Sequence, residues 1–382
     1  MADGSNGKRA SRSVLGDTEN HARVRTTALV IIAFAVVLFM LVQARFLLIS
    51  LATAIILFSL TSDAINYIAR MRVGPVRVPN WLASIVALLM ISTALLSLTA
   101  IILSQANTVL STTLAYTDRA PQAISAMFKW LGPDAEEAVF NSVATLDVAG
   151  YLRTIAGQAG GLMQGTVLVI LFVGFLFAER VWFGTKLESL FGDDMQAEKV
   201  GRIIGSIIHR VNYYLLVKTL VSGVTGLLVY GIARFFELDL AAALGILTFV
   251  LNYIPSIGSI VATVLVALVA FVQLADGTLT LVIFLLAGAV QFFFGNIIDP
   301  MLMGRALRVS SFGIIISLAF WAAVWGIPGM FLAVPIMVAL MIVCSHVPGL
   351  RAVAVLLSRE GLPETDSDLD IALPKAQRRQ AG

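Results

Sequence analysis

Long apolar runs separated by short polar connections dominate this chain. The runs cover residues 27–43, 46–62, 81–103, 161–178, 211–233, 240–274, 279–298 and 309–345. Most of the unbroken runs reach the roughly 20 apolar residues with which a helix crosses the hydrocarbon core of a bilayer. Because lipid cannot pair with free peptide groups, spanning segments of this kind are helical. The pattern therefore predicts an all-α polytopic membrane protein with about eight helical segments.

Two of these runs, 240–274 and 309–345, are too long for one span and are interrupted near the middle. The interruptions are Asn252–Ser259, which contains Pro255 and Gly258, and Gly326-Ile327-Pro328-Gly329. An arm of about 15 residues reaches only roughly 22 Å, short of the hydrocarbon thickness. The breaks therefore predict re-entrant hairpins or pairs of short tilted spans, unless Pro255 merely kinks one tilted helix. Paired interrupted segments are typical of transporter binding sites.

Composition agrees with a membrane protein. Hydrophobic residues make up 59% of the 382 positions and charged residues 13%, and the mean hydropathy is +0.92. Soluble domains carry roughly 25% charged residues. The net charge of +3 is too small to imply a nucleic-acid partner, so the lipid bilayer is the expected partner of this surface.

Lys and Arg are distributed unevenly between the two predicted sides of the membrane. With a cytoplasmic N-terminus, the cytoplasmic segments carry 20 of them and the opposite side carries 5, while Lys218 lies within a span. Cytoplasmic loops are enriched in these residues, so both termini are predicted to be cytoplasmic. The predicted division is a cytoplasmic tail at 1–26, three spans at 27–103, a small extracytoplasmic helical segment at 104–160, a C-terminal transport unit at 161–345 and a cytoplasmic tail at 346–382.

The first break combines residue types that end a helix. Pro255 removes a backbone donor, and Gly258 permits a tight turn. Ser256 and Ser259 could cap the helix that follows, whose N-terminus would then present free N–H groups.

Polar side chains also occur inside the later runs. Gln291, Asn296 and Asp299, followed by Pro300, lie along one run, and each could bind either a neighbouring helix or a substrate. Lys218 is expected to extend toward the cytoplasmic headgroups. If it faces the core instead, it becomes a candidate for an anionic substrate or a gating pair.

Signatures of enzymes are missing from the sequence. It contains no phosphate-binding loop, no histidine inside an apolar run and no cluster of His, Cys and carboxylates. We therefore expect no enzymatic activity, no cofactor and no metal.

The C-terminal third contains a series of motifs in a fixed order. LAAALGILTFVLNYIPSIGS at 240–259 is followed by Gln291, Asn296, Pro300, Gly304-Arg305, Gly326-Ile327-Pro328-Gly329-Met330 and Pro335. In order and spacing these motifs resemble the autoinducer-2 exporter family of bacterial membrane proteins, and the layout agrees from the first hairpin to about Arg351.

The resemblance implies a homo-oligomer with mobile transport units that moves small molecules. Some relatives are associated with export of a quorum-sensing signal, others with sodium–proton exchange. It carries over as a transport site the positions Asn252, Pro255, Gly258, Gln291, Asn296, Pro300, Gly326, Pro328 and Gly329. Many relatives have an aromatic residue in place of Ser256.

The expected function is secondary transport across the bacterial inner membrane. The chain would export a small polar or amphiphilic, autoinducer-2-like molecule by alternating access, with the two broken segments meeting near the midplane. One alternative is cation–proton antiport, for which Asp299 is the plausible carboxylate. Another is a membrane scaffold that acts through its extracytoplasmic helices.

Overall fold

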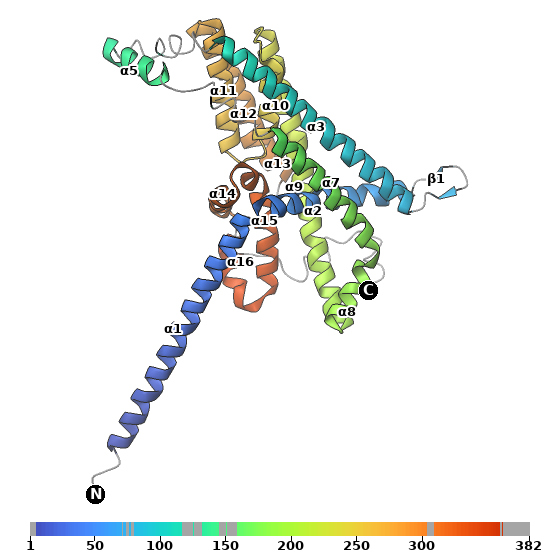
Figure 1. Cartoon of the computed structure of the whole chain (residues 1–382), viewed down its shortest axis with the longest axis vertical. Coiled ribbons are helices and arrows are strands. Elements are labelled where there is room, and N and C mark those ends of the chain that lie inside the picture. The colour runs from blue at the N-terminus through green and yellow to red at the C-terminus, as the bar shows by residue number, and fades with distance from the viewer. Residues whose placement is uncertain are drawn as a thin grey trace.

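The computed structural model describes residues 5–70, 72–73, 76–77, 80–116, 125, 132–144, 150, 159–303, 309–359 and 361 (Figure 1). Its longer helices are α1 (Ser5–Gln43), α2 (Arg45–Arg70), α3 (Asn80–Tyr116), α5 (Pro133–Ala144), α7 (Ala159–Glu179), α8 (Phe183–Phe191), α9 (Asp194–Phe235), α10 (Ala241–Leu251), α11 (Ile257–Leu274), α12 (Gly277–Phe293), α14 (Ser311–Trp325) and α15 (Ile327–His346). Short helical pieces are η2 (Arg180–Trp182), η3 (Phe294–Ile298), α13 (Asp299–Met303), η4 (Pro348–Leu350) and α16 (Arg351–Leu357).

The predicted all-α polytopic architecture is confirmed. Among the described residues, seven helices are long and apolar enough to cross a membrane, and shorter apolar helices lie at Arg45–Thr61, Ala241–Leu251 and Ser311–Trp325. One small antiparallel ladder, which the apolar pattern did not predict, pairs β1 (Arg72–Val73) with β2 (Val76–Arg77).

The helices extend beyond the apolar runs that predicted them. α9 begins at Asp194, well before the run at 211–233, and α3 continues to Tyr116, past the run at 81–103. Much of 104–160 and 346–382 lies outside the described residues, apart from the end of α3, α5 and the segment around α16. In Figure 1, α5 lies near the top of the view and α8 lies below the helices of the core, while α1 extends further down to the bottom. The assignment of α5 and α8 to opposite sides of the membrane stays a prediction.

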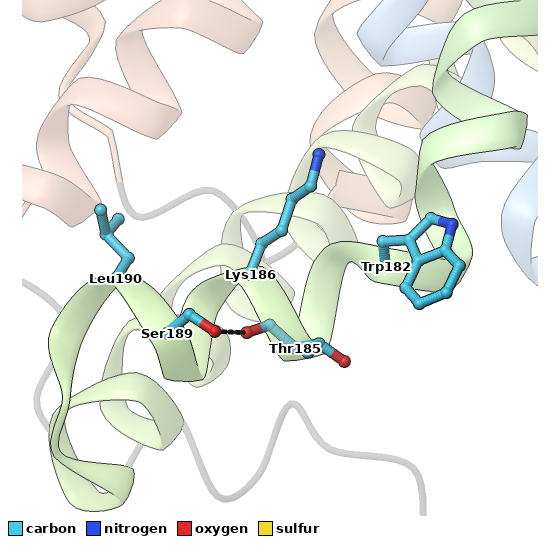
Figure 2. Close-up of a pocket in the computed structure, with 5 residues that line it drawn as sticks. All are labelled: Trp182, Thr185, Lys186, Ser189 and Leu190. Atoms are coloured by element: carbon cyan, nitrogen blue, oxygen red, sulfur yellow. Dashed lines mark hydrogen bonds between the residues drawn. The ribbon is translucent and has the colours of Figure 1, made fainter.

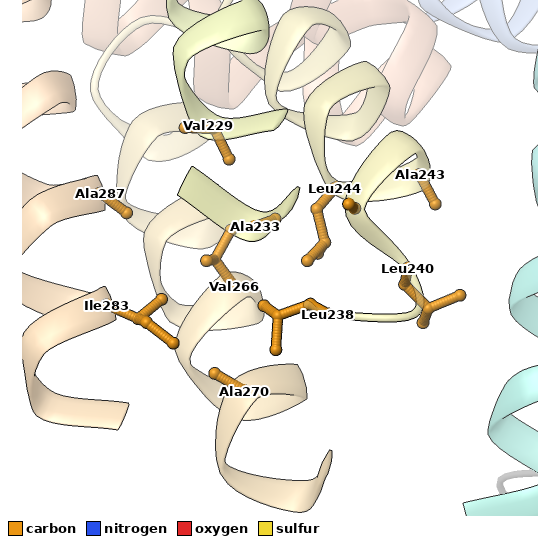
Figure 3. Packing of buried hydrophobic residues seen from close by; sticks show 11 residues of the cluster. Val229, Ala233, Leu238, Leu240, Ala243, Leu244, Val266, Ala270, Ile283 and Ala287 are labelled. Atoms are coloured by element: carbon orange, nitrogen blue, oxygen red, sulfur yellow. The ribbon is translucent and has the colours of Figure 1, made fainter. Parts of the chain in front are cut away.

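The core of the C-terminal unit is built from small and branched side chains of α9 to α12. Figure 3 shows this cluster, which contains Val229, Ala233, Leu238, Leu240, Ala241, Ala243, Leu244, Val266, Ala270, Ile283 and Ala287. Six of its members are fully buried or nearly so: Val229, Ala233, Val266, Ala270, Ile283 and Ala287. In lipid, close van der Waals packing of small residues replaces the hydrophobic effect as the force that holds helices together.

Two glycines allow α9 and α10 to approach closely. A Cβ added to Gly226 would lie 2.7 Å from the Gly245 carbonyl oxygen, and one added to Gly245 would lie 2.8 Å from Tyr230 Cβ. Real Cβ atoms do not come this near, so both positions require glycine. Their contact fixes the distance between α10 and the C-terminal part of α9.

The N-terminal helices form a second cluster. α2, α3 and α7 bury Ala54, Ala83, Ala87, Ile91, Val169, Val173 and Phe177 against one another. Ser59 and Asn212 join this cluster to α9, because the Ser59 hydroxyl donates to Asn212 Oδ1 at 2.8 Å and Asn212 Nδ2 donates to the Ser59 carbonyl at 3.0 Å.

Both predicted breaks are turns between separate helices. α10 ends at Leu251 and α11 begins at Ile257. α14 ends at Trp325 and α15 begins at Ile327, with Gly326 at φ +67° and ψ −144° between them. This conformation is almost exclusive to glycine, and Pro328 then occupies the first turn of α15, where it is tolerated.

The close approach of α9 and α10 gives a test with a matched control in the same helix. Gly226→Ala is expected to lower stability by about 1–3 kcal/mol, because the new methyl group overlaps the backbone of α10. Gly231→Ala is expected to raise it by about 1 kcal/mol, because Gly231 has nothing within 4 Å of an added Cβ and alanine favours the helix. Thermal unfolding of the purified variants in detergent measures both. An equal shift for the two variants would contradict the packing described here.

Candidate functional site

A cavity of about 320 Å³ lies between α9, the turn joining α10 to α11, and the end of α12 with η3. Its polar lining residues are Lys218, Thr225, Asn252, Ser256, Ser259, Gln291, Asn296 and Asp299. Its other lining residues are Val221, Ile254, Pro255, Ile260, Phe294 and Gly295. Polar groups therefore gather in the interior of a unit whose helices are otherwise apolar.

The lining of the cavity contains a buried ion pair. Lys218 Nζ lies 2.5 Å from Asp299 Oδ2, and the two side chains are only 8% and 13% exposed. The expectation that Lys218 extends to the headgroups is wrong. Its position on α9 faces α13, and an ammonium at this depth is stabilised far more by a carboxylate than by the surrounding hydrocarbon.

Asn252 anchors the first break to α9. Its Nδ2 donates to Thr225 Oγ1, and the Thr225 hydroxyl in turn donates to the Val221 carbonyl at 2.9 Å and the Ser222 carbonyl at 3.0 Å. Asn252 and Thr225 are both buried. This chain of bonds holds the end of α10 against the wall of the cavity.

Two buried polar atoms at the cavity lack a partner. Gln291 Nε2 and Asp299 Oδ1 make no hydrogen bond to any residue that the structure describes, and Gln291 is 6% exposed. An unpaired buried amide or carboxylate oxygen costs about 1–3 kcal/mol. The cavity therefore presents one donor and one acceptor that a polar solute could satisfy.

The turn at Ser256 is strained. Ser256 has φ +61° and ψ −51°, and the Ile257 amide donates to the Pro255 carbonyl at 2.6 Å. This is a γ-turn with positive φ, a rare and strained conformation. The prediction that Ser256 caps α11 is wrong, because its side chain makes no capping bond, and Ser259 Oγ instead donates to the Ser256 carbonyl at 3.0 Å. Strain of this kind concentrates at functional sites.

A π-helical stretch forms the opposite wall. η3 spans Phe294–Ile298 and ends directly before Asp299. Asn296 Nδ2 donates to the Phe292 carbonyl at 3.1 Å, while its side chain is exposed at the rim of the cavity. Single π-helical turns inside α-helices often mark functional sites.

The structure brings together six of the predicted site residues. Those that line the cavity are Asn252, Pro255, Ser256, Gln291, Asn296 and Asp299. Those that do not are Gly258, Pro300, Gly326, Pro328 and Gly329, and the Gly304-Arg305 motif lies outside the described residues.

The predicted glycines beside the breaks hold the turns. A Cβ on Gly258 would collide with the Leu251 carbonyl, and one on Gly329 would collide with the Trp321 carbonyl. The helices on either side of the second break contact the first break, because Ile254 packs against Leu318 of α14 and Ala333 of α15. These helices therefore support the α10–α11 turn, and the second break does not line the cavity.

Sequence reasoning missed Thr225 and Val221, named Ser259 only as a candidate helix cap, and gave Lys218 the wrong surroundings. Lys218, Val221 and Thr225 recur at helical spacing on one face of α9. A charged residue in an apolar span, followed on the same face by a buried hydroxyl, was the available signal for this wall of the cavity.

A second hollow, of about 370 Å³, lies at the surface beside α8. Figure 2 shows its lining residues, Trp182, Thr185, Lys186, Ser189 and Leu190, all from η2 and α8. Trp182 is 60% exposed and Leu190 75% exposed. The Ser189 hydroxyl donates to the Thr185 carbonyl at 2.8 Å and Lys186 pairs with Glu179, so local contacts occupy these two side chains.

Comparison with known proteins agrees with a membrane protein. The sequence profile described as AI-2E family transporter matches residues 29–349. The chain therefore belongs to the AI-2E family of membrane transporters.

Individual relatives are similar over most of the same region. The chain is 29% identical over 289 residues to the AI-2 transport protein TqsA of Escherichia coli, an overlap covering 74% of this chain and 82% of that protein. It is 27% identical over 288 residues to a Haemophilus influenzae protein described as a candidate transport protein, with the same shares. A similarly described protein of Borreliella burgdorferi is 30% identical over 227 residues, which is 58% of this chain and 62% of that protein.

Relief of the γ-turn gives a second test. Ser256→Gly is expected to raise stability by about 1 kcal/mol, because glycine adopts positive φ without steric cost. Ser104→Gly, a matched control within regular helix α3, is expected to lower it by about 0.5 kcal/mol. Thermal unfolding in detergent gives both values. Destabilisation by both substitutions would mean that the Ser256 turn stores no strain.

Proposed function

We propose that this chain is a secondary transporter that exports a small polar or amphiphilic molecule across the bacterial inner membrane by alternating access. The observation that carries the proposal is the polar cavity beside the α10–α11 turn, with its unpartnered donor and acceptor. Such groups inside apolar helices are costly unless a ligand or water pairs with them.

The size of the cavity supports a small cargo. Its volume of about 320 Å³ is at the lower end of the roughly 300–1,000 Å³ range of small-molecule sites. The AI-2 transport activity named for TqsA is consistent with a cargo of this size. We propose an autoinducer-2-like molecule as the first substrate to test and quorum sensing as the setting.

The two ends of the cavity differ in exposure, which supports a route for entry. Lys218, Asn252 and Gln291 are buried, whereas Ser256, Ile260 and Asn296 are exposed in the isolated chain. We propose that movement of the α10–α11 turn, together with α14 and α15 that pack against it, exposes the buried side of the cavity to the other side of the membrane. Both termini would lie in the cytoplasm, and several copies would assemble into a homo-oligomer.

Cation–proton antiport remains the second candidate, because Asp299 lies at the cavity and its Oδ1 has no described partner. The Lys218 ammonium on its other oxygen weighs against this alternative. A cation would have to compete with a charge that is already bonded to the carboxylate.

Flux through reconstituted vesicles tests the proposal. Autoinducer-2 is expected to accumulate in proteoliposomes of the wild type, while a pH-gradient dye shows no response specific to sodium or potassium. Gln291→Leu is expected to raise the half-saturating concentration roughly fivefold, the loss of about one neutral hydrogen bond. Gln164→Leu, an exposed glutamine of α7 away from the cavity, is the control and should not change it.

The dye result separates the two candidates. Cation-dependent recovery of the dye without autoinducer-2 flux would favour antiport and contradict the exporter proposal. An equal effect of the two glutamine substitutions would show that the cargo does not bind at Gln291.

A further inference from the structure

The lining of the cavity contains one positively charged and one negatively charged side chain. Lys218 and Asp299 are the charged residues among the described lining residues, and they lie in direct contact, with Nζ to Oδ2 at 2.5 Å. The two side chains are 8% and 13% exposed, so water screens them little. The described part of the cavity therefore has no net charge, although it contains two full charges.

Each group keeps unused bonding capacity toward the cavity. An ammonium has three donors, and Lys218 Nζ is bonded to Asp299 alone among the described residues. Asp299 Oδ1 has no described partner. The pair therefore holds itself together and still offers hydrogen bonds to a third molecule.

A free ion would either add an uncompensated charge beside the buried pair or replace one member of the pair. A sodium ion on Asp299 would leave the Lys218 ammonium buried beside it, and an anion on Lys218 would leave the carboxylate uncompensated. Breaking a buried ion pair by removing one partner is strongly destabilising, because the remaining charge has no counterion. An uncharged solute avoids this cost, because it can bind beside the intact pair.

We propose that Lys218 and Asp299 set the charge selectivity of the cavity by acting as each other's tethered counterion. Lys218 takes the place that an inorganic cation would take on Asp299, and Asp299 takes the place of an anion on Lys218. The cavity then accepts uncharged solutes and excludes free ions. An accepted solute carries a donor for Asp299 Oδ1 and an acceptor for Gln291 Nε2. The step from ion exclusion to an uncharged cargo rests on the proposed transport function.

Removal of either charge by substitution should leave the other charge free to bind an ion from solution. In Lys218→Met the carboxylate of Asp299 loses its counterion and becomes a cation site. In Asp299→Asn the ammonium of Lys218 becomes an anion site. In the double variant Lys218→Met/Asp299→Asn both side chains are uncharged, and the cavity should bind neither ion.

Ion binding to the purified full-length protein tests this pattern. Equilibrium dialysis with radioactive sodium and radioactive chloride is expected to show about one sodium ion bound to Lys218→Met and about one chloride ion bound to Asp299→Asn. The wild type and the double variant are expected to bind neither. In parallel, sodium in place of choline should raise the apparent Tm of Lys218→Met alone, since a ligand that binds only the folded state stabilises it. Chloride in place of gluconate should raise the apparent Tm of Asp299→Asn alone.

Two results would overturn the proposal. Saturable sodium or chloride binding by the wild type would mean that an ion displaces one member of the pair. A folded Lys218→Met variant without sodium binding would mean that Asp299 does not become a cation site. If a single variant does not fold, the proposal is tested by sodium and chloride binding to the wild type and to the charge-exchanged variant Lys218→Asp/Asp299→Lys. The charge-exchanged variant should bind neither ion.

The experiment separates this proposal from the proposed function. Ion binding is measured without any flux, so an absence of autoinducer-2 flux together with the expected binding pattern would reject that transport activity alone. Autoinducer-2 flux together with sodium binding by the wild type would support transport and reject the tethered-counterion role of Lys218.

Discussion

Lipid offers no hydrogen-bond partner to a peptide group, and every irregular segment of the C-terminal unit has to meet this constraint. The α10–α11 break meets it with short-range bonds, including those from the Ile254 amide to the Leu251 carbonyl at 2.9 Å and from the Gly258 amide to the Ile254 carbonyl at 3.1 Å. Contacts with α14 and α15 then bury the turn, because Ile254 packs against Leu318 and Ala333. The helices that flank the second break therefore have a structural role at the first break.

The polar cavity depends on the same arrangement. A turn in the middle of an apolar unit brings Asn252 and Pro255 beside α9 and η3, where a continuous helix would place a regular surface. The turn is held by glycines that allow close backbone contact and by the bond from Asn252 to Thr225. Strain at Ser256 and the unpaired groups at Gln291 and Asp299 are costs that the surrounding helices have to offset.

Most of the fold could be predicted from the apolar pattern, and part of the candidate site could be predicted from residue chemistry. Run length and the two Pro-Gly interruptions predicted the helices and the turns between α10 and α11 and between α14 and α15. The partner of Lys218 could not be predicted, because Asp299 lies 81 residues further along the chain and hydropathy carries no information about pairing. The backbone angles of Ser256 could not be predicted either, because a serine directly before a helix more often caps that helix. Close approach of Gly226 and Gly245 depends on how α9 and α10 dock, which no local pattern records.

The π-helical stretch before Asp299 also affects how this chain compares with its relatives. A π-helical turn is commonly equivalent to one residue added to an α-helix, and each residue of an α-helix turns the chain by about 100°. The π-helical backbone of Phe294–Ile298 therefore sets the direction in which the Asp299 side chain leaves the helix. A relative with the same acid but an unbroken α-helix would direct that carboxylate to another face, away from the residue equivalent to Lys218. An alignment would then show the same residue at this position in both proteins, although the two carboxylates face different surroundings. Deletion of one residue from the π-helical stretch could therefore change which solute is transported without changing any lining side chain.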